Sequence, residues 1–254
     1  MGFINKLFSA IGIEHASVDA RLHVSAVSPG ERLCGEIHLN GGTLNQQFRD
    51  FELVLMTKAE RKSQHGGQLV TIPLQRVHIN QSVAIQAGEH IRIPFEMHLP
   101  FHVPLSLGQV KVWLGTEAVL LMAPDPEDRD DVRVVAHAAQ QMVLNAWEGM
   151  GFRLFRTENI YNPRLKARFR QRLYFHPNAE YRKRLKEIMI SFQLSARKLT
   201  VEWSLIRIDG AQKTDRDDIV KQANATFTHA QLRNFAVPGL TEIFSDILRK
   251  SFDD

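Results

Sequence analysis

Two runs near the start of the chain alternate apolar and polar residues with a period of two. The apolar positions are Val18, Ala20, Leu22 and Val24 in the first run and Leu33, Gly35, Ile37 and Leu39 in the second. This alternation is typical of strands with one buried and one exposed face. Between the runs, Pro29 suits the second position of a tight turn, and Gly30 accepts the positive φ that a type II turn requires next. The pattern predicts two adjacent antiparallel strands joined at a Pro29-Gly30 corner.

Further strand patterns follow along the chain, each bounded by Gly or Pro. The clearest lie at residues 47–60, 68–79, 89–98 and 109–122, and then at 152–158, 165–175, 188–195 and 199–208. Helical spacing of apolar residues predicts helices at residues 2–12 and 138–149 and a last helix that begins at Pro238. Many strands with few intervening helices indicate an all-β fold with a few helices.

The chain has 254 residues, more than a typical single domain, so we expect two domains. The stretch APDPEDRDD, residues 123–131, contains two prolines and five acidic residues and is unsuited to a core. Residues 1–136 carry 12 Lys/Arg against 15 Asp/Glu, whereas residues 137–254 carry 20 against 13. These changes predict an N-terminal β-sandwich lobe at 1–123, an acidic, Pro-containing linker at 124–136 and a C-terminal β-sandwich lobe at 137–254 that carries the later helices.

Composition argues against a membrane or secreted protein. Hydrophobic residues make up 44% and charged residues 24% of the chain, and no window contains the 18 or more apolar residues of a membrane span. The first residues lack the continuous apolar core of a signal peptide, because Asn5 and Lys6 interrupt it. Cys34 is the single cysteine and cannot form an internal disulfide, which fits a reducing compartment. We therefore expect a cytoplasmic protein.

The sequence offers no argument for an enzyme, a metal site or a cofactor. His98 and His102 have the spacing of two ligands on a helix, but Pro100 lies between them at the end of an expected strand. The acidic residues around Asp128 lack the central Gly and the final Glu of a calcium loop. Cys34 lies on an alternating strand with no His partner marked by the sequence, and neither a glycine-rich phosphate loop nor a G-x-S-x-G motif occurs.

Three motifs occur in a fixed order along the first 155 residues. The first comprises Pro29, Gly30, Glu31 and Gly35, the second Ile93, Pro94, Phe95 and Pro100, and the third Val112, Trp113, Leu114, Thr116, Asp125, Asp128 and Asp130. The segment Gly151-Phe152-Arg153-Leu154 follows them. Together they resemble the bacterial sporulation-control protein family, which is similar in fold to the arrestins. This resemblance implies two β-sandwich lobes in tandem, used as an interaction or regulatory module rather than as an enzyme.

A basic stretch, RLKARFRQRLYF at residues 164–175, is the strongest functional signal. Its cations alternate with other residues and are Arg164, Lys166, Arg168, Arg170 and Arg172. If this stretch is one strand, the cations share one face at intervals of about 6.6 Å, close to the phosphate spacing of an extended backbone. Arg182, Lys183 and Arg184 follow after a turn and could extend the surface. The predicted role is partner or anion binding, since guanidinium groups bind carboxylate and phosphate bidentately; the alternative is a solvated face whose charges deter edge pairing.

Two classes of function remain open. The first is a non-catalytic regulatory protein that binds partner proteins, either an acidic partner at the basic stretch or a peptide added to a sheet edge. The second is an electrostatic binder of nucleic acid or anionic membrane through residues 164–186. Salt separates them, because nucleic-acid affinity falls steeply as counterions are released. The sequence indicates neither the partner nor the oligomeric state.

Overall fold

The computed structural model describes residues 16–48, 51–63, 66–118, 130–207 and 219–251. The helix expected at residues 2–12 lies outside the described residues. The chain forms two compact units that interleave along the sequence. The first unit is made of Met1–Lys58, Thr71–Ser106 and Lys111–Val135, and the second of Ala59–Val70, Leu107–Val110 and Ala136–Asp254. Each unit is described by itself below.

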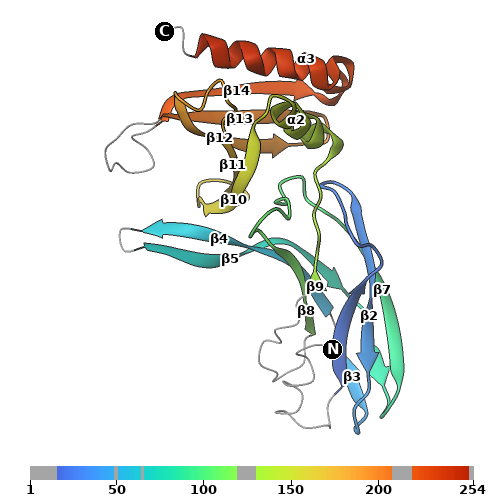
Figure 1. Ribbon diagram of the computed structural model, residues 1–254. Coiled ribbons are helices and arrows are strands. Elements are labelled where there is room, and N and C mark those ends of the chain that lie inside the picture. The colour runs from blue at the N-terminus through green and yellow to red at the C-terminus, as the bar shows by residue number, and fades with distance from the viewer. Residues whose placement is uncertain (1–15, 49–50, 64–65, 119–129, 208–218, 252–254) are drawn as a thin grey trace. The chain divides into compact units, whose positions relative to one another are not determined.

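The first unit is a β-sandwich (Figure 1). Its strands are β1 (Ser17–Leu22), β2 (Arg32–Asn40), β3 (Gln46–Phe48), β4 (Phe51–Ser63), β5 (Gly66–Ile79), β6 (Val83–Ile85), β7 (His90–His98), β8 (Val112–Ala118) and β9 (Asp130–Asp131). The end of β4 and the start of β5, within Ala59–Val70, belong to the second unit. One sheet has the order β1-β2-β7, a small sheet pairs β3 with β6, and further pairing links β5, β4, β8 and β9. The core forms where the alternating apolar side chains of the sheets are buried, as with Leu33 and Ile37 of β2 and Leu53 and Leu55 of β4.

The Pro29-Gly30 corner is confirmed. Glu31 N donates to Ser28 O at 3.0 Å, and Gly30 has a φ of 85°, the positive value of a type II turn. The two flanking strands, β1 and β2, are antiparallel neighbours. A Cβ atom on Gly30 would also collide with the Phe101 ring. Glycine is therefore required here for its backbone conformation and for the close approach of a side chain.

Part of the expected linker is built into the first unit. β9 pairs with β8, Val132 N donates to Val112 O at 2.9 Å, and Val134 forms a parallel bridge with Val27. Val134 is 1% exposed. The acidic run is thus followed by Val132 and Val134, two alternating valines that belong to the sandwich. The many charged residues beside them made this short strand pattern hard to recognise in the sequence. The linker residues before Asp130 lie outside the described ranges.

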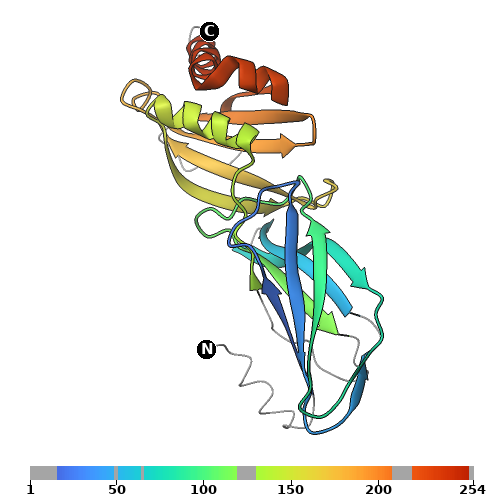
Figure 2. The same cartoon turned by 90° about the vertical axis from the view of Figure 1, so that its right-hand side faces the viewer.

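The second unit combines one antiparallel sheet with two helices. Its main elements are α2 (Ala138–Gly149), β10 (Arg153–Tyr161), β11 (Phe169–His176), β12 (Leu185–Leu194), β13 (Lys198–Arg207), β14 (Ile219–Thr228) and α3 (His229–Lys250). The strand order is β14-β13-β12-β11-β10, and the end of β4 joins β10 in parallel through Glu60 and Ile160. Figures 1 and 2 show both helices on one face of this sheet.

An aromatic core fills the space between the sheet and the helices. The Trp147 ring of α2 stacks on Phe244 of α3 at a centroid distance of 5.1 Å, and Phe175 and Trp203 supply the sheet side of the same cluster. The buried positions Leu240, Phe244 and Leu248 repeat every four residues, the spacing of one helix face. In the described residues the second layer of this lobe is therefore helical, where the sequence predicted a second sheet.

Two boundaries in the second unit differ from the prediction. α3 begins at His229 rather than at Pro238, because Thr228 and Gln231 form a capping box there. The helix then kinks at Ala236, whose φ of 51° and ψ of −174° are not helical, just before Pro238. β14 was not predicted at all, since its residues IVKQANATFT lack a strong apolar alternation.

Candidate functional site

Three of the predicted cations lie on the turn between β10 and β11. Arg164, Lys166 and Arg168 are all exposed. Asn162 organises the turn. Its side-chain oxygen accepts a hydrogen bond from Arg164 N at 3.1 Å, and its backbone N–H donates to Arg168 O at 2.8 Å. Because residues 163–168 form this turn, the predicted strand begins only at Phe169. The prediction of five cations on one strand face is wrong.

Three more of the predicted cations lie on the turn between β11 and β12, at the opposite end of β11. Arg182, Lys183 and Arg184 are exposed. Asn178 organises this turn, because its side-chain oxygen accepts from the N–H groups of Glu180 and Tyr181, each at 3.1 Å. In each cationic turn, an Asn side chain therefore adds hydrogen bonds to those of the backbone.

Arg170 and Arg172 are the two predicted cations that share a strand. Both are half-buried on the face of β11 that points away from the helices, since the alternate residues Leu173 and Phe175 belong to the aromatic core. Arg170 forms an ion pair with Glu202 of β13, whose second oxygen accepts a hydrogen bond from the Gln193 amide of β12. The charge of Arg170 is thus balanced within the sheet.

A hollow of about 370 Å³ lies on this outer face. It spans four strands, and its polar lining includes Arg170, Arg172, Ser191, Glu202, Ser204 and Asn224. The sequence could not predict that these residues line one hollow, because their proximity depends on how the four strands are paired. One signal was present: in β13 the polar residues alternate with the apolar residues Leu199, Val201 and Trp203, and the latter set is buried.

Tyr174 lies beside this hollow on the same face of β11. Its hydroxyl donates to Glu158 of β10, and the Arg156 guanidinium lies 3.9 Å from the centre of its ring. Burial, and next the hydrogen bond with Glu158, raise the pKa of Tyr174 well above its ordinary value, while the nearby Arg172 acts weakly in the opposite direction. Tyr174 therefore stays neutral and engages both Glu158 and Arg172.

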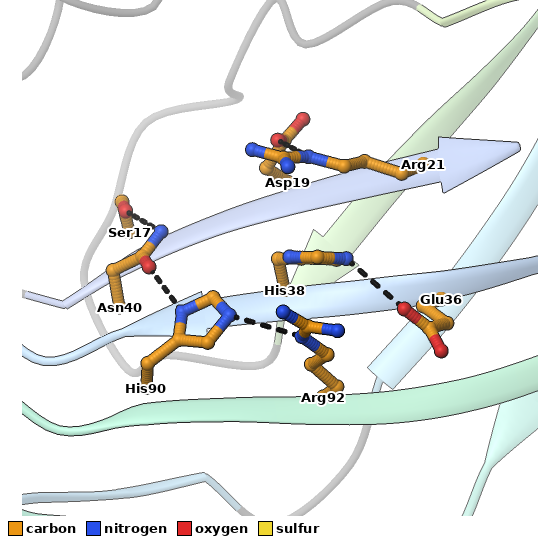
Figure 3. A network of polar contacts seen from close by, with 8 residues as sticks. All are labelled: Ser17, Asp19, Arg21, Glu36, His38, Asn40, His90 and Arg92. Carbon is orange, nitrogen blue, oxygen red and sulfur yellow. Dashed lines mark hydrogen bonds and ion pairs between the residues drawn. The ribbon is translucent and has the colours of Figure 1, made fainter.

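A second polar cluster lies in the first unit, on the outer face of the β1-β2-β7 sheet (Figure 3). It consists of Ser17, Asp19, Arg21, Glu36, His38, Asn40, His90 and Arg92. Asn40 connects the three strands, because its amide donates to Ser17 Oγ at 3.2 Å and its oxygen lies 2.5 Å from His90 Nδ1. His38 Nε2 lies 3.2 Å from a Glu36 oxygen.

The cluster in Figure 3 is mainly a structural link between strands. His38 lies on the outer face of β2, opposite the buried apolar positions, yet only 7% of its side chain is exposed. The neighbouring His90 ring, 5.2 Å away, contributes to this burial. Within the described ranges no group of three or more His, Cys, Asp and Glu residues could hold a metal ion. Among the helices described, none is long and apolar enough to cross a membrane.

The comparisons with known proteins identify relatives of this chain. A family described as SpoOM protein matches residues 4–208, which extends past the region that carries the sequence motifs. The sporulation-control protein spo0M of Bacillus subtilis (strain 168) is 34% identical over 199 residues, which cover 76% of each chain. The crystal structure of Spo0M from Bacillus subtilis matches with a TM-score of 0.82 and 27% identity over 93% of this chain and 99% of that one.

The fold is therefore that of a mostly β protein of the arrestin-like class, with a sandwich unit and a unit in which helices cover a sheet. Within that class, the chain belongs to the SpoOM protein family of sporulation-control proteins. The resemblance drawn from the three motifs is confirmed.

Proposed function

We propose that the protein is a non-catalytic regulatory protein that binds an acidic partner protein through the outer face of its second unit. The binding surface, called the basic surface below, comprises Arg164, Lys166, Arg168, Arg170, Arg172, Arg182, Lys183 and Arg184. One observation carries the proposal: two turns with exposed cations lie at the two ends of β11, and the Arg-lined hollow lies between them.

The spacing of these cations suits an extended acidic segment. β11 has eight residues, so its ends are separated by about 26 Å. The field of exposed charges decays over about 8 Å at physiological salt, so cations this far apart bind separate acidic groups rather than one. A partner that carries acidic residues along an extended or flat surface fits this arrangement, and residues 137–254 carry 20 Lys/Arg against 13 Asp/Glu to attract it.

Two observations support a regulatory rather than a catalytic role. The relatives are named as sporulation-control proteins, a designation of regulation. The carboxylate inside the hollow, Glu202, is bound by both Arg170 and Gln193. Both oxygens of this carboxylate are therefore engaged by neighbouring side chains of the sheet.

Charge reversal on the two turns tests the proposal. The variant carries Arg164→Glu, Lys166→Glu and Lys183→Glu, and the matched control carries Arg197→Glu, Lys198→Glu and Arg233→Glu. All of these side chains are exposed in the second unit, and both variants change the net charge equally. We expect the turn variant to lose partner capture from a cytoplasmic extract and the control to retain it, with both melting close to the parent protein because exposed charges contribute under about 1 kcal/mol each.

The same experiment separates the classes of partner. The captured material is analysed after nuclease treatment, and the protein is also sedimented with vesicles that contain anionic lipid. Retained capture by the turn variant, or capture that nuclease abolishes, would contradict the proposal. Vesicle binding that depends on the turn cations would favour an anionic membrane instead.

A further inference from the structure

The hollow lies where two strands of the sheet diverge. β10 and β11 pair along their whole length, and β12 and β13 do so along theirs. β11 and β12, in contrast, pair only at the three positions from Leu173↔Ile190 to Phe175↔Ile188. Towards the start of β11, where Arg170 and Arg172 lie, no further pair joins these two strands in the described residues. Loss of pairing opens a depression on the outer face that side chains line.

One charged donor in this depression lacks an acceptor. Arg170 forms an ion pair with Glu202, whereas Arg172 forms no direct ion pair in the part of the chain that the structure describes, although Glu158 is its cross-strand neighbour. The Nε atom of Arg172 is buried and has no hydrogen-bond partner there. A buried guanidinium N–H without an acceptor is unfavourable, so an acceptor supplied by a ligand would be stabilising there.

Neutral donors lie around the Nε atom of Arg172. Ser191 of β12 and Ser204 of β13 line the hollow and are 4% and 5% exposed. Their cross-strand neighbours are Glu202 and Met189, respectively, so both hydroxyls point to the same outer face. On the other side lies Glu158, the cross-strand neighbour of Arg172, and one oxygen of this carboxylate accepts a hydrogen bond from Tyr174.

We propose that this hollow binds a single carboxylate group, an Asp or Glu side chain of the partner, with Arg172 Nε as the charged donor and Ser191 as a neutral one. This inference rests on the proposed function and names the group that the basic surface recognises. A carboxylate fits better than a phosphate monoester for a reason of charge. One arginine donor of the site lacks an acceptor, and the nearby carboxylates Glu202 and Glu158 repel a second negative charge on the ligand.

The Nε–H of arginine is directly observable, which gives a test independent of any partner. The full chain, labelled with ¹⁵N, is titrated with a glutamate residue blocked at both ends, N-acetyl-glutamate N-methylamide. We expect one Arg Nε–H resonance, assigned to Arg172 by its absence in Arg172→Lys, to shift in a saturable manner. The blocked glutamine analogue should leave it unmoved. Arg172→Lys and Ser191→Ala should each weaken glutamate binding, the former by about tenfold for one charge-assisted hydrogen bond, and Arg197→Lys should not.

Each possible result bears on the inference. No shift at Arg172, an equal shift with the glutamine analogue, or tighter binding of inorganic phosphate than of blocked glutamate would overturn it. If Arg172→Lys fails to fold, Ser191→Ala and the parent titration decide the matter. Partner capture that depends on the cationic turns, together with no glutamate binding, would refute the carboxylate site and leave the proposed function standing. Glutamate binding at Arg172, together with partner capture that does not depend on the cationic turns, would support the carboxylate site and refute the proposed function.

Discussion

At the scale of single residues, the three tyrosines lie in three different electrostatic settings. A hydrogen bond from Arg168 is the main cause that lowers the pKa of Tyr161. Burial is the main cause that raises the pKa of Tyr174 and of Tyr181. The Arg168 contact is local to its turn, whereas the raised pKa of Tyr174 is due first to burial and next to Glu158 on a neighbouring strand. The alkaline titration of the protein therefore reports on both kinds of contact.

We expect Tyr161 to ionise first and Tyr174 last when absorbance at 295 nm is followed as pH rises, and Tyr161→Phe to remove the earliest step.

The raised folded-state pKa of Tyr174 also affects stability. Its contribution is fully present below the unfolded value of about 10 and is lost as pH rises towards the folded value. The free energy of unfolding should thus fall less steeply above pH 10 in Tyr174→Phe than in the parent. An unchanged slope would mean that Tyr174 ionises freely.

Gly30 gives a second residue-scale prediction. A residue with a side chain pays about 1–2 kcal/mol for a left-handed backbone, and overpacking against a neighbour adds about 1–3 kcal/mol. Gly30→Ala meets both costs, because φ is 85° and the new Cβ would contact Phe101. Gly88→Ala meets only the first, since its φ is 72° and nothing lies within 4 Å. Urea unfolding should show Gly30→Ala to be the less stable variant; equal losses would remove Phe101 from the explanation.

At the scale of elements, the sequence predicted those that depend on local signals. α2 coincides with the predicted residues 138–149. The prediction succeeds because both of its signals, the helical spacing of apolar residues and the glycine at the end, lie within the same twelve residues. β10 to β13 were placed by their apolar alternation. The start of β11 was missed because the alternation of cations with other residues already begins at Arg164, inside the turn that hydrogen bonds of Asn162 organise.

The candidate site was only half predictable for a related reason. Arg170 and Arg172 could be selected from the sequence, because their charges alternate along a single segment. Glu202, Ser191 and Tyr174 acquire their roles from neighbours on other strands. Those neighbours depend on register and on the divergence of β11 from β12, and neither leaves a pattern within one strand. Sequence reasoning therefore found the charges and not the hollow.

The kink in α3 gives an element-scale prediction. Ala236 has a φ of 51° and a ψ of −174°, a region that only glycine occupies readily. Ala236→Gly should therefore stabilise the protein by about 1 kcal/mol, the lower end of the cost of such a conformation. Ala230→Gly, in the regular first turn of the same helix, should destabilise it by up to about 1 kcal/mol. Thermal melting of the two variants in opposite directions is the expected result; destabilisation by both would mean that Ala236 is not strained.

At the scale of the whole molecule, the units are not consecutive pieces of chain. The second unit includes Ala59–Val70 and Leu107–Val110, which come from the half of the sequence assigned to the first lobe. Within that unit, Glu60 pairs with Ile160, the Arg61 guanidinium lies 4.6 Å from the centre of the Tyr161 ring, and Leu107 packs against the aromatic core. A boundary drawn at one point of the sequence therefore removes parts of the second unit.

A fragment of residues 136–254 tests this organisation. It retains both helices and β10 to β14, so we expect the near-ultraviolet circular dichroism of the Trp147 and Trp203 cluster to persist. It lacks the strand end that pairs with β10 and the Leu107 side chain, so its melting temperature should be lower than that of the second unit in the full chain. Hydrogen exchange locates the loss: amides around Ile160 should exchange faster in the fragment, while those of β13, which is flanked by β12 and β14 in both forms, should lose less protection. Equal protection around Ile160 in the two forms would show that the inserted segments contribute nothing, and an unfolded fragment would show that they contribute far more than an edge contact.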